Sequence, residues 1–242
     1  MPLYRDEAIV LRTHKLGEAD RIITLLSRHH GRIRAVAKGV RRTTSRWGSR
    51  LEPFTHVDLM LAEGRNLDTI TQAETLTAFS SRLGLDYDRY TAGTVMLETA
   101  ERLVVEDKEP ALQHFLLLVG GLRAMTAGER RAGEVLDSYL LRSLSVAGYA
   151  PSFGGCARCG LEGSHRWFNP SAGGVLCATC RLPGSVSPAP ETVQLLGALL
   201  AGDWPLVDTA EPRHRKEASG LVSAYVAWHL ERGLRSMAYV ER

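Results

Sequence analysis

The spacing of four cysteines constrains this chain more than any other feature of its sequence. Cys156 and Cys159 form one C-x2-C pair, Cys177 and Cys180 form a second, and seventeen residues separate the two pairs. Each pair can direct two thiolates at one tetrahedral ion, which is the ligand pattern of a zinc site. Four protein ligands leave no position for water, so we expect a structural Zn2+ and no metal catalysis. His165, between the pairs, is the alternative to one thiolate.

We expect a cytoplasmic protein without a membrane-spanning segment. The longest apolar run, 115–119, is far shorter than the roughly 18 residues that a spanning helix needs. Charged Arg5, Asp6 and Glu7 stand where a secretory signal would place its apolar stretch. Because cytoplasmic proteins seldom keep disulfides, two bridges between neighbouring cysteines are the weaker interpretation of the cysteine pattern.

Positive charge is concentrated in one segment. Between Arg28 and Arg50 there are eight Lys or Arg and no acid, whereas the whole chain holds 30 bases and 27 acids. A local block of this kind indicates a polyanion partner, and nucleic acid is the commonest one. The alternative is a solvated surface with no partner.

The N-terminal third has the pattern of a small β-barrel. Five β-branched or alternating segments are separated by turn residues: 6–14, 21–27, 32–38, 54–62 and 67–76. Five short strands fit an OB-fold, whose face and loops bind single-stranded nucleic acid, and an SH3-like barrel gives the same strand count. We assign 1–80 to this domain.

The third predicted strand continues into a cationic loop. Because strand side chains alternate, Ile33, Ala35 and Ala37 share one face and the basic residues the other. Such a surface can follow a nucleic-acid backbone, and Trp47 can either stack on a base or pack under the barrel. The predicted nucleic-acid surface comprises Arg32, Arg34, Lys38, Arg41, Arg42, Arg46, Trp47 and Arg50.

Apolar residues recur at helical spacing in 81–150 and again in 186–242, which predicts one helical domain interrupted by a zinc module at 151–185. Gly120 and Gly121 fall inside one predicted helix, 111–125, where they indicate close helix contact or a kink. The last helix is expected over 218–237. The fold class is therefore α+β.

Motifs of common enzyme classes are absent. No lysine is followed by Ser or Thr, which excludes a P-loop, and there is no H-E-x-x-H, G-x-S-x-G or G-x-G-x-x-G. With every cysteine assigned to metal, no thiol nucleophile remains. We expect a protein that is not an enzyme.

A series of short motifs resembles the RecO family of bacterial recombination mediators. The resemblance is most specific over 8–54 and 156–180 and is weak in the helices. The motifs are Ala8–Arg12, Gly17–Arg21, Gly31–Ile33, Val36–Arg42, Ser45–Arg46, Leu51–Phe54, Phe168–Pro170 and Gly173–Cys177.

This resemblance implies an OB-fold, a helical domain and a zinc module that stabilises this branch of the family. It also implies binding of single- and double-stranded DNA, annealing of complementary strands even when single-strand-binding protein coats them, and action with RecR to load RecA on the nucleoid. RecR would contact chiefly the N-terminal domain, and the acidic C-terminal tail of single-strand-binding protein the helical domain. The alternative function is a zinc-ribbon OB protein that binds structured RNA or docks on a polymerase.

Overall fold

The computed structural model describes residues 2–42, 45, 47–230 and 233–240. The chain divides into two compact units, Met1–Glu129 and Arg130–Arg242. None of the described helices is long and apolar enough to cross a membrane.

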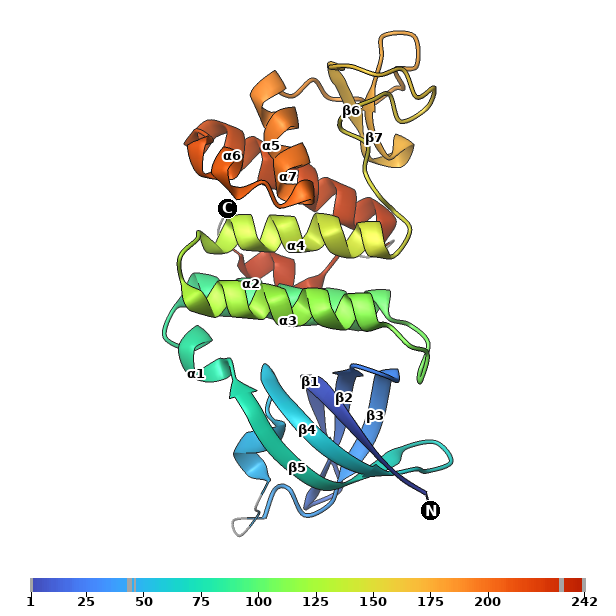
Figure 1. Cartoon of the computed structure of the whole chain (residues 1–242), viewed down its shortest axis with the longest axis vertical. Helices are drawn as coiled ribbons and strands as arrows, with labels where there is room; N and C mark the ends of the chain where they lie inside the picture. The colour runs from blue at the N-terminus through green and yellow to red at the C-terminus, as the bar shows by residue number, and fades with distance from the viewer. Residues whose placement is uncertain (1, 43–44, 46, 231–232, 241–242) are drawn as a thin grey trace. The chain divides into compact units, whose positions relative to one another are not determined.

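A closed five-stranded barrel forms the first part of the first unit (Figure 1). The strands close in the order β1-β2-β3-β5-β4, with β3 and β5 parallel and β1 paired to both β2 and β4. The crossover that places β5 between β3 and β4 gives the Greek-key barrel of the OB-fold. The predicted barrel is confirmed, with strands at Leu3–Leu16 (β1), Asp20–Ser27 (β2), Gly31–Ala37 (β3), Thr55–Ala62 (β4) and Asp68–Ala78 (β5).

The interior of the barrel follows the alternation of its strands. Ile33, Ala35 and Ala37 of β3 are buried in the barrel core together with Leu59 and Leu61 of β4. The intervening side chains of β3 point outward, so one face of this strand is core and the other is cationic, as the sequence predicts.

Helices cover β1 and β2 on the outside of the barrel. After α1 (Ser80–Leu83), the helices α2 (Tyr87–Leu103) and α3 (Leu112–Ala127) pack on each other and against these two strands (Figure 1). The interface buries Ile9, Leu26 and Phe115 completely or almost so. α3 runs through Gly120, where a Cβ would meet no atom within 4 Å, so close helix contact does not explain that glycine.

The link between α2 and α3 touches the start of β3. Gly31 has a φ of 61°, and a Cβ there would lie 1.8 Å from the carbonyl oxygen of Glu109. The backbone N–H of Lys108 donates to the carbonyl of Arg32 at 2.9 Å. Only glycine at position 31 leaves room for the backbone of Glu109, and this close contact holds the α2–α3 link beside the cationic strand β3.

The second unit combines three packed helices with a small ribbon. α4 (Ala132–Val146), α5 (Pro190–Ala201) and α7 (Pro212–His229) pack together, and α6 (Trp204–Thr209) follows α5. Between α4 and α5, the strands β6 (Trp167–Asn169) and β7 (Gly174–Leu176) form an antiparallel pair. Short 3-10 helices occupy Gly48–Leu51 in the first unit and Pro170–Ala172 and Arg235–Tyr239 in the second.

The predicted bounds of the last helix, 218–237, are wrong. α7 begins six residues earlier because Pro212 occupies its first turn, where the missing N–H costs nothing and the fixed φ suits a helix. It ends at His229, and a separate 3-10 turn follows at Arg235–Tyr239.

Candidate functional site

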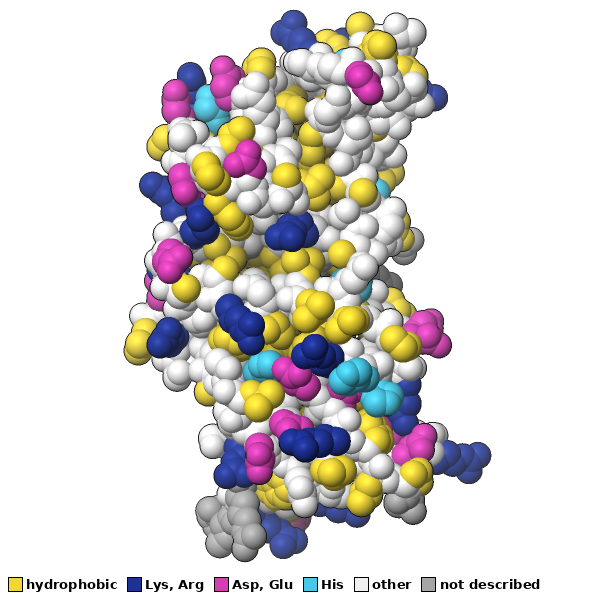
Figure 2. All heavy atoms as spheres, viewed as in Figure 1, with side chains coloured by type: hydrophobic (Ala, Val, Ile, Leu, Met, Phe, Trp, Pro, Cys, Tyr) yellow, Lys and Arg dark blue, Asp and Glu magenta, His cyan; other side chains and the backbone are white. Residues whose placement is uncertain are grey.

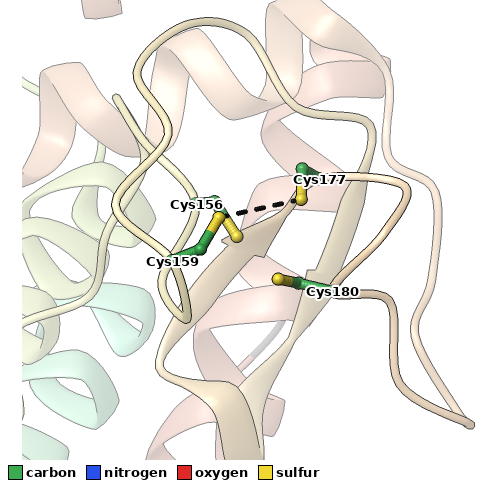
Figure 3. A group of neighbouring side chains, drawn as sticks. All are labelled: Cys156, Cys159, Cys177 and Cys180. Atoms are coloured by element: carbon green, nitrogen blue, oxygen red, sulfur yellow. Dashed lines mark hydrogen bonds between the residues drawn. The ribbon is translucent and has the colours of Figure 1, made fainter.

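The four cysteines converge on one point at the end of the β6–β7 ribbon (Figure 3). Their sulfur atoms all lie within 4.8 Å of one another, and Cys159 Sγ is 3.9 Å from Cys177 Sγ. With Zn–S bonds of about 2.3 Å, sulfurs at the corners of a tetrahedron are about 3.8 Å apart. The cluster therefore fits a metal ion held by four thiolates. His165 is not part of it, because its Nε2 lies 2.6 Å from the carbonyl oxygen of Leu161.

Backbone groups and neighbouring sulfurs shift the pKa values of the cysteine thiols. Hydrogen bonds from backbone N–H groups lower the pKa of the Cys156 thiol to about 6. The N–H of Cys177 has the largest effect, followed by those of Cys159 and Arg158. Contact with the sulfurs of Cys159 and Cys177 raises the pKa of the Cys180 thiol to about 12. A divalent cation relieves this crowding because it displaces the thiol protons and balances the thiolate charge.

An aromatic series joins the ribbon to α7 within the second unit. Phe168 of β6 is buried, with its ring 6.3 Å from that of Phe153 and 6.2 Å from that of Tyr225. The Tyr225 ring lies 4.4 Å from His229, and its hydroxyl donates to the carbonyl of Tyr149. The cysteine cluster therefore holds in place a strand that packs directly on the helices.

The cationic residues that the sequence predicts as a nucleic-acid surface have unequal surroundings. Arg34, Lys38 and Arg42 are exposed and form no ion pair with any described carboxylate. They lie on the outer face of β3 and in the segment after it. These three side chains offer unneutralised positive charge to a polyanion.

Three other members of this predicted surface have partners. Arg32 places its Nε 2.6 Å from a carboxylate oxygen of Asp107, in the link between α2 and α3. Arg41 donates to the carbonyls of Gly17 and Glu18, and Arg50 to the carbonyl of Ala73 at 3.0 Å. Carbonyl partners orient the last two guanidinium groups and leave their charge in place, whereas Asp107 neutralises Arg32.

The remaining two predicted residues differ again. Trp47 is half-buried and packs against the barrel core, which is the second of the two roles its sequence context allows. Arg46 lies outside the described residues. On the face of the barrel unit seen in Figure 2, Lys and Arg side chains are interspersed with Asp and Glu side chains.

A groove in the second unit has no counterpart in the sequence prediction. It encloses about 240 Å³ between α4, α5 and α7. Leu195, Leu199 and Ala218 contribute apolar wall, and Arg131 and Lys216 are exposed at it. The ion pair between half-buried Arg215 and buried Glu134, with an N–O distance of 2.6 Å, forms part of the same wall. Sequence periodicity identifies the helices but not the concave surface that they enclose.

Comparison with known proteins gives one result over the whole chain. The family models described as "Recombination protein O N terminal" and "Recombination protein O C terminal" match residues 1–79 and 84–238. The chain is 81% identical to the DNA repair protein RecO of a Nocardioides species over 99% of its own length and all of the relative's. It is 59% identical to the proteins of the same name from Streptomyces coelicolor and Thermobifida fusca, over the full length of each.

Proposed function

Because the chain belongs to the RecO family of DNA repair proteins, we propose that it binds single- and double-stranded DNA and anneals complementary strands in recombinational repair. The observation that carries the proposal is the unpaired positive charge of Arg34, Lys38 and Arg42 on the outside of the barrel. OB-folds bind single strands through such a charged surface.

Annealing by this surface requires no bond chemistry. Two complementary strands repel each other through their phosphates, and cations that neutralise phosphates of both lower that repulsion. Phosphate contacts carry no base information, so strands of any sequence are brought together alike. The protein acts in this proposal as a mediator and not as an enzyme.

We assign Zn2+ to the four cysteines. Cys156, Cys159, Cys177 and Cys180 complete a closed ligand shell, so the ion supplies folding energy and no reactive position. The DNA-binding surface lies in the other unit, which separates the metal from the annealing step in this proposal.

Partners follow from the same proposal. RecR binds chiefly the N-terminal domain, residues 1–80, and acts with this protein to load RecA, in the cytoplasm and on the nucleoid. We assign the acidic C-terminal tail of single-strand-binding protein to the groove between α4, α5 and α7, because the groove offers apolar wall together with exposed Arg131 and Lys216, while its two carboxylates, Glu134 and Asp137, are buried. A Lys216→Gln variant should bind a peptide of that tail more weakly; unchanged binding would exclude the groove.

The test of the central proposal is annealing of two complementary strands that have been coated with single-strand-binding protein, with no nucleotide present. We expect the protein to accelerate duplex formation. No acceleration while salt-sensitive DNA binding persists would reject the mediator function. A preference for structured RNA in the same assay would favour the zinc-ribbon alternative.

A further inference from the structure

A second cationic feature of the first unit lies away from β3. Where the end of β5 and α1 meet the C-terminal turn of α3, a pocket of about 360 Å³ is present. It is lined by Thr77, Phe79, Arg82, Arg123, Thr126 and Ala127. No carboxylate lines it, and two guanidinium groups do.

The two arginines have no evident structural task. Both are exposed, and neither pairs with a carboxylate in the described ranges. The C-terminal carbonyls of α3 would attract cations, but Arg89 already donates to those of Met125 and Gly128, at 3.2 and 3.3 Å. Arg82 and Arg123 are therefore left available to an external anion.

The chemistry of the pocket fits a phosphodiester group. Guanidinium groups bind phosphate oxygens through paired N–H donors. The hydroxyl of Thr77 lines the same pocket and can donate a further hydrogen bond, whereas the hydroxyl of Thr126 already donates to the carbonyl of Leu122 at 2.9 Å. We propose that Arg82 and Arg123 bind the backbone of the DNA strand that the β3 surface holds, at a point further along that strand.

β5 connects the two places. Arg50, a member of the predicted surface, donates to the carbonyl of Ala73 in the middle of β5. Thr77 is four residues further along, a distance of about 13 Å at ~3.3 Å per residue. The intervening Glu74 lies opposite Asp58, and the Arg5 guanidinium pairs with Asp58, so one negative charge remains at this point of β5. The distance along β5 is nevertheless short enough for one strand of DNA to contact the surface and the pocket together.

This inference rests on the proposed DNA binding, and its test separates the two. Binding of oligodeoxythymidine of about 4 and about 20 nucleotides, at the lower limit of and beyond the usual site size of one OB-fold, is measured by fluorescence anisotropy at several salt concentrations, because the short one has too few phosphates to occupy the β3 surface and the pocket together. The variants are Arg82→Gln with Arg123→Gln, and Arg142→Gln as a control that removes an exposed arginine of the second unit without an ion pair among the described residues. A thermal unfolding curve verifies that each variant is folded.

For the long oligonucleotide, loss of two phosphate contacts should reduce the slope of log affinity against log salt by about 1.4. Equivalently, the loss of affinity between about 50 and 200 mM salt becomes about sevenfold smaller. The short oligonucleotide and the control should show no change, and Arg82→Lys with Arg123→Lys should retain the slope.

Three results would overturn the inference. Equal loss for both lengths would indicate a general charge effect, and unchanged binding of the long oligonucleotide would remove the contact. If inorganic phosphate binds at the pocket and the variants bind DNA as the wild-type protein does, the pocket is a site for a free anion and not for DNA. Failure of the wild-type protein to bind either length would reject the proposed function itself.

Discussion

Arg32 and Arg34 are two residues apart on the same outer face of β3, but their charges have different surroundings. Arg32 is paired with Asp107 at 2.6 Å, and its side chain is 22% exposed. Arg34 is exposed and forms no ion pair among the described residues. If phosphate neutralisation drives DNA binding, Arg34→Gln should weaken it, whereas Arg32→Gln should have little effect, because Asp107 already competes for that guanidinium.

The size of the change in salt dependence follows from the number of cations on the predicted surface that no carboxylate neutralises. Five described residues of the predicted β3 surface keep their charge in this way, and for an oligonucleotide too short to reach the pocket of Arg82 and Arg123 they give, at ~0.7 per single-strand contact, a slope of log affinity against log salt of about −3.5. Arg34→Gln should change it to about −2.8, and Asp107→Asn, which releases Arg32, to about −4.2 with tighter binding. The five are Arg34, Lys38, Arg41, Arg42 and Arg50.

The assay is a salt titration of anisotropy with one single-stranded oligonucleotide for all variants, each shown to be folded. The decisive comparison is between the two neighbouring arginines. Equal losses for Arg32→Gln and Arg34→Gln, or weaker binding by Asp107→Asn, would refute the reasoning, because unpaired charge would then not determine the contact.

Three further predictions concern stability and metal. Cys177→Ser should lower the zinc content and expose the second unit to limited proteolysis while the first unit stays resistant; a soluble variant with full zinc content would contradict the four-thiolate site. Burial raises the pKa of the Asp6 carboxyl, but hydrogen bonds with His30 and His29 outweigh it and leave the pKa below its usual value. The contribution of Asp6 to stability is therefore present above about pH 3.9, the pKa in the unfolded state, and is lost as pH falls through the lower pKa of the folded state. In Asp6→Asn, the free energy of unfolding measured in urea should depend less on pH in that acid range. An unchanged pH dependence would exclude this role. Gly17 has a φ of 57° and open space around it, so Gly17→Ala should lower the free energy of unfolding by about 1 kcal/mol. Gly31→Ala adds the clash with the carbonyl oxygen of Glu109 and should lower it clearly more in the same denaturation assay. Equal losses for the two variants would show that the clash has no effect.

Features with a local cause could be predicted from the sequence. The period-two pattern of Ile33, Ala35 and Ala37 located a strand and its core face, and the cysteine spacing located the thiolate cluster. Both depend on residues that lie close together in the chain or on a spacing that only a few structures satisfy.

Features that depend on tertiary contacts could not be predicted. Nothing near Arg32 in the chain indicates that Asp107, 75 residues away, neutralises it. The cationic pocket needs α1 and α3 to approach the end of β5, and Arg82 and Arg123 are 41 positions apart. The start of α7 at Pro212 did have a local signal, the proline itself, but the apolar spacing used to place this helix begins six residues later.

The closure of the barrel ties the beginning of the chain to its later strands. β1 pairs with β2 next to it in sequence, and Leu3 also pairs with Ala62 of β4. During synthesis β1 therefore emerges long before its second neighbour, and its open edge is exposed until residue 62 has left the ribosome. Pairing at such sequence separation slows folding through the entropy of loop closure. A peptide tag fused before Leu3 would therefore extend from a strand whose second edge has to stay free for β4, and we expect such a tag to hinder closure of the barrel.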